Sequence, residues 1–268
     1  MTEIVTPNLN GLAKSVVKAE AFRKFDDGSI TASAFFSGFF WLNNSRLFIV
    51  TNWHNVTGLN SIDGSRLGSF TPSHVSVLFY GHKTNGPAAV HPKIERHRVV
   101  VPLYNEEHEP QWIGHSSSPT VDVVAIPFPQ FETSAWHIVA MNRMVDFETS
   151  WKPRVMDECF IIGFPEGIQA PIFKRGTLAS DMQSGATANN PYLIDTLGNR
   201  GLSGAPVIGK GTGILNPGGD RNVTLQSKIG TWLNFCGVYA GRMSDHGVGS
   251  QLGRVFPPEV VRELPFPN

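Results

Sequence analysis

Three short motifs carry residue types that can perform nucleophilic and acid–base chemistry. In the first, a serine lies between glycines in the segment 201–207, and a proline and apolar residues follow it. A free hydroxyl is a weak nucleophile, so it needs a base to take its proton and donors to hold the oxyanion formed on attack. Glycines let backbone N–H groups converge on such an oxyanion. Glycine–serine turns are also common in ordinary loops, so Ser203 alone does not establish a site.

The other two motifs supply a histidine and an acid beside apolar runs. His54 follows the run 48–50, and histidine is the usual general base near neutral pH. Asp122 precedes the apolar run 123–126, where an unpaired charge would be costly and a histidine N–H would be a suitable partner. Each residue also has an ordinary interpretation, as a strand-capping histidine or a hydrated surface acid. The three together favour a triad of Ser203, His54 and Asp122.

The elements that must position these residues are predicted to be strands. Short segments rich in aromatic and β-branched residues are bounded by Gly, Pro, Asn or Ser, which is typical of a sandwich or barrel. These segments are 33–42, 46–54, 73–81, 97–104, 121–128, 158–165, 191–197 and 235–241. Helical patterns are confined to 11–24, which could form an amphipathic turn or two, and to 257–264, a short C-terminal helix. The sequence therefore predicts an all-β fold.

Composition narrows the class of protein further. The chain has 268 residues, a length normal for one all-β unit built from two halves. Its net charge of zero gives no basis for binding nucleic acid or a membrane surface through bulk charge. No signal-peptide pattern and no apolar run of about 20 residues is found, so a cytoplasmic location is expected. Histidines do not occur at metal-ligand spacing, so we expect no metal and no cofactor.

The two cysteines, Cys159 and Cys236, are expected to be free and buried, behaving as small apolar residues. A single disulfide between them is the alternative. A small secreted scaffold would use more cysteines, in pairs.

The order His54, Asp122, Ser203 along the chain is that of chymotrypsin and differs from the orders in α/β-hydrolases and subtilisin. The sequence resembles the trypsin-like (chymotrypsin-fold) serine peptidases, and is nearest in style to bacterial, disulfide-poor members such as the HtrA-type proteases. Five segments carry the resemblance: the histidine box 51–54, the aspartate box 121–126, the strand and turn 160–165, the serine box 201–207 and the following strand 236–241.

This resemblance implies two six-stranded antiparallel β-barrels, a chymotrypsin-like double barrel, with a short C-terminal helix. Residues 1–30 would form an N-terminal arm. Residues 31–140 would form the first barrel, with the histidine and aspartate. Residues 141–268 would form the second barrel, with the serine and the C-terminal helix.

The resemblance also implies roles. Ser203 would attack the scissile carbonyl of a polypeptide substrate, His54 would act as general base and then acid, and Asp122 would orient the imidazole. The backbone N–H groups of Gly201 and Ser203 would form the oxyanion hole.

Substrate selection is expected to involve the strand after the serine. Ala240, Gly241 and Arg242 would pair with the substrate backbone as an added strand. By its offset from the serine, Leu197 would lie near the base of the primary pocket, and Tyr239 and Arg242 would line or rim it. With no acid at the base, a small or apolar residue on the acyl side of the cut is expected.

Two departures from the family pattern carry consequences. Leu202 stands where many digestive and clotting members have an acid, so activation by pairing a new N-terminus with that acid is not expected. Ala240 stands where a hydroxyl residue often supports the aspartate. Two alternatives remain open at this stage: a catalytically silent binding module on the same fold, and a latent protease ordered by an activating protein partner, motivated by the expected loops 105–120 and 209–222.

Overall fold

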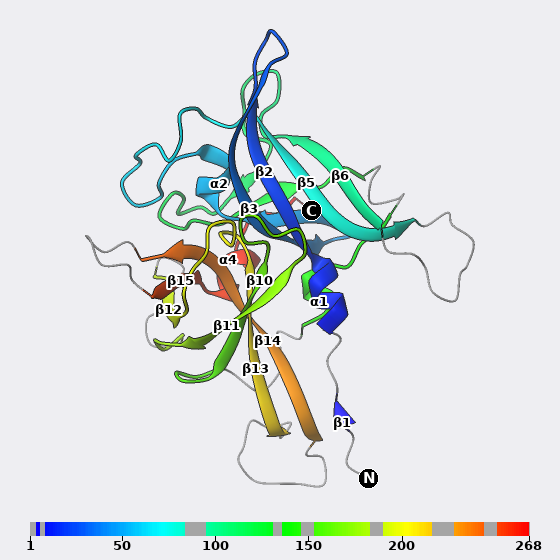
Figure 1. Cartoon of the computed structure of the whole chain (residues 1–268), viewed down its shortest axis with the longest axis vertical. Coiled ribbons are helices and arrows are strands. Elements are labelled where there is room, and N and C mark those ends of the chain that lie inside the picture. Colours follow the sequence, from blue (N-terminus) through cyan, green and yellow to red (C-terminus); the bar gives the residue numbers. More distant parts are fainter. Residues whose placement is uncertain are drawn as a thin grey trace.

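The computed structural model consists mainly of strands arranged in two sheets (Figure 1). It describes residues 4–5, 9–83, 95–130, 136–145, 153–182, 190–215, 228–243 and 251–267. The helices in these ranges are short: α1 (Leu9–Ser15), α2 (Trp53–Thr57), α4 (Pro258–Arg262) and the 3-10 turn η1 (Met141–Arg143). None of the helices in the described ranges has the length and apolar character to cross a membrane. The predicted all-β class is confirmed.

The first sheet carries the histidine and the acid. Its strands are β2 (Val16–Lys24), β3 (Ile30–Asn43), β4 (Arg46–Thr51), β5 (His74–Lys83), β6 (Glu95–Pro102), β7 (Ile113–Gly114) and β8 (Val124–Pro127). Their order is β6-β5-β2-β3-β4-β8-β7, all antiparallel, and β9 (Trp136–His137) pairs with β5. In the described part of the chain, the end strands β6 and β7 do not pair with each other.

The second sheet carries the serine. Its strands are β1 (Ile4–Val5), β10 (Glu158–Gly163), β11 (Ile172–Leu178), β12 (Tyr192–Asp195), β13 (Pro206–Leu215), β14 (Lys228–Arg242) and β15 (Leu252–Phe256). The order is β1-β14-β13-β10-β11-β12-β15, and β15 also pairs with β14, so the six antiparallel strands form a ring. The two-residue β1 adds to β14 in parallel. These sheets confirm the chymotrypsin-like double-barrel prediction, with short extra strands at the edges.

Three apolar clusters hold the sheets together. One fills the first sheet, around Phe40 and Phe79, and another fills the second sheet, around Cys159 and Val207. The third draws residues from both sheets and from α4. In it, Phe39 and Trp41 of β3 pack on Phe235 of β14, with ring centroids 5.5 and 5.8 Å apart. This shared core fixes the first sheet relative to the second, so residues carried by different sheets can form one site.

The N-terminal region differs from its prediction. Of residues 11–24, where a helical turn or two is expected within an arm ending at residue 30, residues 11–15 belong to α1, but residues 16–24 form the strand β2. This strand pairs with both β3 and β5 and lies inside the first sheet. Val16, Val17, Ala19 and Ala21 are buried there, because pairing on both edges makes the segment part of the core. In Figure 1 the β2–β3 hairpin and the β13–β14 hairpin project from opposite ends of the molecule.

Other expectations can be compared with the described residues. The C-terminal helix is present as α4, with Pro258 in its first turn. Residues 209–215, expected to begin a loop, continue β13, because they pair with β14 along the whole hairpin; residues 216–222 lie outside the described ranges. The expected loop 105–120 contains the short strand β7. Cys159 and Cys236 are free and buried, as predicted.

Candidate active site

The corner between β4 and α2 positions His54. The apolar strand β4 ends at Thr51, and α2 begins after Asn52, whose extended backbone (φ −83°, ψ 150°) turns the chain. The helix is a single turn, ended by Gly58 in the left-handed region at φ +70°. This places the His54 backbone N–H and imidazole on the same side, toward Asp122.

Asp122 is completely buried and receives two hydrogen bonds from one residue. The His54 backbone N–H donates to Oδ1 at 2.9 Å, and Nδ1 of the ring contacts Oδ2 at 2.6 Å. A carboxylate only accepts hydrogen bonds, so the Nδ1 proton lies toward Asp122. The two contacts fix the orientation of the ring and compensate the buried acid. The ring N–H is the donor that the sequence predicted for Asp122, and the His54 backbone N–H supplies a second donor although Ala240 offers no hydroxyl.

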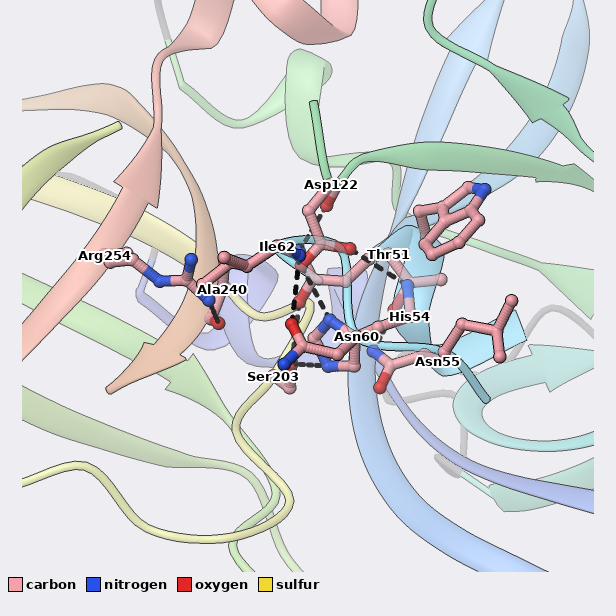
Figure 2. Close-up of polar contacts among 12 residues, drawn as sticks. Thr51, His54, Asn55, Asn60, Ile62, Asp122, Ser203, Ala240 and Arg254 are labelled. Atoms are coloured by element: carbon pink, nitrogen blue, oxygen red, sulfur yellow. Dashed lines mark hydrogen bonds and ion pairs between the residues drawn. The ribbon is translucent and has the colours of Figure 1, made fainter. Parts of the chain in front are cut away.

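The imidazole connects the acid to the serine on the other sheet. Its Nε2 lies 2.7 Å from Ser203 Oγ. The dashed contacts among Asp122, His54 and Ser203 can be followed in Figure 2. The His54 side chain is 19% exposed, whereas Asp122 is fully enclosed. The structure therefore brings together the three residues that the sequence singled out, with the histidine open to solvent on one edge.

The turn that carries Ser203 is tied to both sheets. Gly201 and Gly204, on either side of the serine, have φ of +88° and +84°, in the region that favours glycine. The Ser203 carbonyl accepts a bond from the Ser37 N–H at 2.9 Å, and the Gly201 carbonyl accepts one from Ser37 Oγ at 2.7 Å. From the second sheet, the Tyr239 carbonyl accepts from the Gly204 N–H at 2.8 Å.

Two backbone donors of this turn remain available. Among the hydrogen bonds of the described residues, none uses the N–H of Gly201 or the N–H of Ser203. These are the two groups expected to hold an oxyanion. The space around Gly201 admits no side chain: a Cβ there would lie 2.5 Å from the Phe164 carbonyl oxygen and 2.8 Å from the Glu166 nitrogen. Glycine is thus required by both the positive φ and the close backbone approach.

Two residues that the sequence reasoning did not single out also contact this centre. Ser37, from β3, holds the carbonyls of the serine turn as described above. Asn52, fully buried, donates from Nδ2 to the Asp122 carbonyl at 2.7 Å, and its Oδ1 accepts from Ser203 Oγ at 2.7 Å. In the sequence Asn52 stood out only as a polar residue between an apolar strand and the histidine, within the histidine box 51–54.

The residues expected to select substrate lie in different environments. Leu197 is 61% exposed, so its side chain is not enclosed at the base of a pocket. Tyr239 is buried, and burial raises its pKa to about 12. A Cβ on Gly198 would lie 2.6 Å from Arg242 Cγ and would also meet the Tyr239 hydroxyl, so these two side chains cover Gly198. The Ala240 carbonyl accepts a hydrogen bond from Nη2 of the Arg254 guanidinium at 3.4 Å (Figure 2).

Metal binding finds no support in the part of the chain that the structure describes. No group of three or more His, Cys, Asp or Glu side chains there could hold a metal ion.

The chain as a whole is similar to solved structures of HtrA-type proteases. The chain matches the HtrA-type protease AlgW, solved with a tripeptide, over 96% of its length with a TM-score of 0.51 and 15% identity. It matches Deg5 over 94% of its length with a TM-score of 0.51 and 19% identity. This chain has the trypsin-like serine protease fold. It spans 62% of the AlgW chain and 88% of the Deg5 chain. No protein-family model matches the sequence, and no curated protein does.

One feature of this trypsin-like fold bears on activation. Leu202, directly before the serine, is completely buried and belongs to the apolar cluster of the second sheet. The position that carries an acid in many digestive and clotting members therefore makes apolar contacts here.

Proposed function

We propose that this chain is a serine endopeptidase that cleaves peptide bonds through an acyl-enzyme. The observation that carries the proposal is the continuous series of contacts from Asp122 to His54 at 2.6 Å and from His54 to Ser203 at 2.7 Å. The distances lie within hydrogen-bond reach, as a nucleophile, its base and the group orienting that base require.

The proposed reaction has two halves. Ser203 Oγ attacks the scissile carbonyl carbon while its proton passes to His54 Nε2, and Asp122 stabilises the imidazolium that forms. The oxyanion is held by the N–H groups of Gly201 and Ser203. His54 then gives its proton to the leaving amine as the C–N bond breaks. Water, deprotonated by His54, attacks the ester, and Ser203 recovers its proton as the acid product leaves. The chemistry needs no cofactor.

A polypeptide substrate is supported by the structure of the HtrA-type protease AlgW, which was solved with a tripeptide. The end of β14, residues 240–242, lies beside the serine turn through the bond between Gly204 and Tyr239, so a peptide could add there as a strand. We propose a small or apolar residue on the acyl side of the cut, because no acid stands at position 197 and the side chains of Tyr239 and Arg242 cover the neighbouring Gly198.

The test is cleavage of an unfolded protein, such as reduced and alkylated casein, with new N-termini identified by mass spectrometry. Wild type should generate new N-termini, and Ser203→Ala and His54→Ala should lower the rate by about 10³-fold or more. Cleavage that survives in Ser203→Ala would contradict the proposal. A well-folded wild type that cleaves nothing and labels only weakly with a fluorophosphonate alone, but strongly when a protein partner is added, would favour the latent form.

A further inference from the structure

The Tyr239 hydroxyl is a buried donor without a partner. Tyr239 is 1% exposed, and its hydroxyl makes no hydrogen bond in the part of the chain that the structure describes. A buried hydroxyl without a partner is destabilising, and buried polar groups in proteins are nearly always paired. Burial raises the pKa of Tyr239 to about 12, although the charges of Arg242 and Arg254 act in the opposite direction. The hydroxyl therefore keeps its proton near neutral pH and can donate it to a ligand.

The side chain of Arg242 lies over this hydroxyl. A Cβ on Gly198 would meet the Tyr239 hydroxyl and would lie 2.6 Å from Arg242 Cγ, so the phenol and the arginine stem share one small space. Arg242 is exposed, and rotation of its long side chain would uncover the hydroxyl. Among the described residues, neither Arg242 nor Arg254 forms an ion pair with an acid. The positive charge at this place is thus not neutralised by the chain itself.

These groups lie beside the candidate nucleophile. Gly198 precedes Ser203 by five residues, and the Tyr239 carbonyl accepts a hydrogen bond from the Gly204 N–H at 2.8 Å. Arg254 adds a second positive charge, because it donates to the next carbonyl along β14 at 3.4 Å (Figure 2). A peptide whose carbonyl is attacked by Ser203 would therefore bring the side chain of its acyl residue close to unpaired donors.

We propose that Arg242 and Tyr239 select an acidic residue on the acyl side of the cut, with aspartate as the residue that is both small and acidic. The inference rests on the proposed function and narrows its preference for a small residue. The Arg242 guanidinium would donate to the carboxylate in a charge-assisted hydrogen bond, for which arginine is well suited. The Tyr239 hydroxyl would donate to the same carboxylate as the arginine stem turns aside. Each unpaired donor then has an acceptor, and the positive charge has a counter-charge.

The experiment compares acyl residues in one peptide library on the full chain. Peptides with randomised flanking residues carry Asp, Asn, Ala or Glu at one fixed position, and mass spectrometry gives the relative kcat/KM for cleavage after it. Asp and Asn have nearly the same size, so their ratio reports the charge. Cleavage after Asp should be about 10-fold or more faster than after Asn, because hydrogen bonds to charged groups are stronger than neutral ones. Cleavage after Glu should be slower than after Asp, since the space over Gly198 is small.

Two variants test the two donors. Arg242→Gln keeps a polar side chain without the charge, and its ratio of Asp to Asn cleavage should fall to about 2-fold or less. Tyr239→Phe removes only the hydroxyl and should lower the ratio about 3-fold. Because that hydroxyl has no partner to lose, the free energy of unfolding of Tyr239→Phe, measured in urea, should not fall. Each ratio is taken within one variant, so a general loss of activity cancels.

Arg154→Gln is the matched control. Arg154 is exposed just before β10 and forms no ion pair among the described residues, so its replacement removes the same charge from another part of the second half of the chain. Its ratio of Asp to Asn cleavage should equal that of the wild type.

The outcomes separate the inference from the proposed function. Equal cleavage after Asp and Asn by the wild type, or a wild-type ratio in Arg242→Gln, would overturn the inference and leave the proposed function intact. A wild type that reacts with a fluorophosphonate at Ser203 but cleaves no peptide containing Asp would also overturn the inference. A well-folded wild type that neither reacts nor cleaves would refute the proposed function and the inference with it.

Discussion

Ser37 links the two sheets at the serine turn, so its replacement by alanine gives a sharp test. The side chain is fully buried on β3. Its Oγ donates to the Gly201 carbonyl at 2.7 Å and accepts from the Phe164 N–H at 2.9 Å. The Ser37 backbone N–H donates to the Ser203 carbonyl, and this bond survives the substitution. Ser37→Ala thus releases one side of the oxyanion turn without altering the triad.

The expected magnitude follows from these two contacts. The substitution leaves a buried carbonyl and a buried N–H without partners, each costing about 1 kcal/mol or more. The free energy of unfolding should therefore fall by roughly 2–3 kcal/mol. The bond from Ser37 to the Gly201 carbonyl stabilises the conformation of the turn in which the N–H groups of Gly201 and Ser203 can hold an oxyanion. Losing about 1 kcal/mol of this stabilisation should lower the rate of fluorophosphonate modification about 5-fold.

Ser15→Ala is the matched control. Ser15 is also fully buried, and its Oγ donates to the Leu12 carbonyl at 2.8 Å, away from the serine turn. Urea unfolding and the rate of fluorophosphonate modification would be measured on both variants. Ser15→Ala should lose stability and keep the wild-type rate. An equal modification rate in Ser37→Ala and Ser15→Ala would refute the reasoning that Ser37 holds the oxyanion turn.

One further single substitution, and a pH series on a double cysteine variant, test other parts of the structure. Gly201→Ala should slow fluorophosphonate modification by about 10²-fold, since its Cβ would press on the Phe164 carbonyl and displace an oxyanion donor; an unchanged rate would contradict this. Burial raises the pKa of Cys159 to about 12 and raises that of Cys236 as well, from an ordinary 9.0. The unfolded chain therefore loses these protons first, and the free energy of unfolding should fall above pH 9, by about 1.4 kcal/mol per thiol at pH 10. The Cys159→Ala/Cys236→Ala double variant should show a smaller fall in urea titrations; equal falls would argue against thiol ionisation as a cause.

The sequence predicted the fold class and the three central residues because both depend on local patterns. Apolar strands separated by turn residues indicate a sandwich or barrel whatever the details of pairing, and the resemblance of five segments to the trypsin-like peptidases implied the double barrel. A buried strand that leads into His54 or follows Asp122 is also a local pattern. Their chain order then suggested that they meet Ser203, and the structure places them within hydrogen-bond distance.

The strand β2 could not be assigned from its own sequence. Its segment contains Lys18, Ala19, Glu20 and Ala21, residue types that favour helices or are neutral in strands. Pairing with β3 on one edge and β5 on the other overrides this preference, because it buries alternate positions. Such pairing depends on residues far along the chain, which local propensity does not contain.

Ser37 and Asn52 were missed for a related reason. The Ser37 hydroxyl bonds to Gly201, 164 positions away, and Asn52 bonds to Ser203, 151 positions away. A buried serine in an apolar strand and an asparagine at a strand end are unremarkable in sequence. Leu197 shows the opposite case: its offset from Ser203 suggested a pocket base, but the conformation of the intervening residues leaves it exposed.

In the proposed mechanism Ser203 is a nucleophile activated by His54. The most direct test of this role is fluorophosphonate labelling of wild type, Ser203→Ala and His54→Ala, with intact-mass detection. The wild type should take up one adduct, located at Ser203 by peptide mapping, and neither variant should take up any in the same time. A well-folded wild type that takes up no adduct, or an adduct that persists in Ser203→Ala, would contradict the proposed role of Ser203.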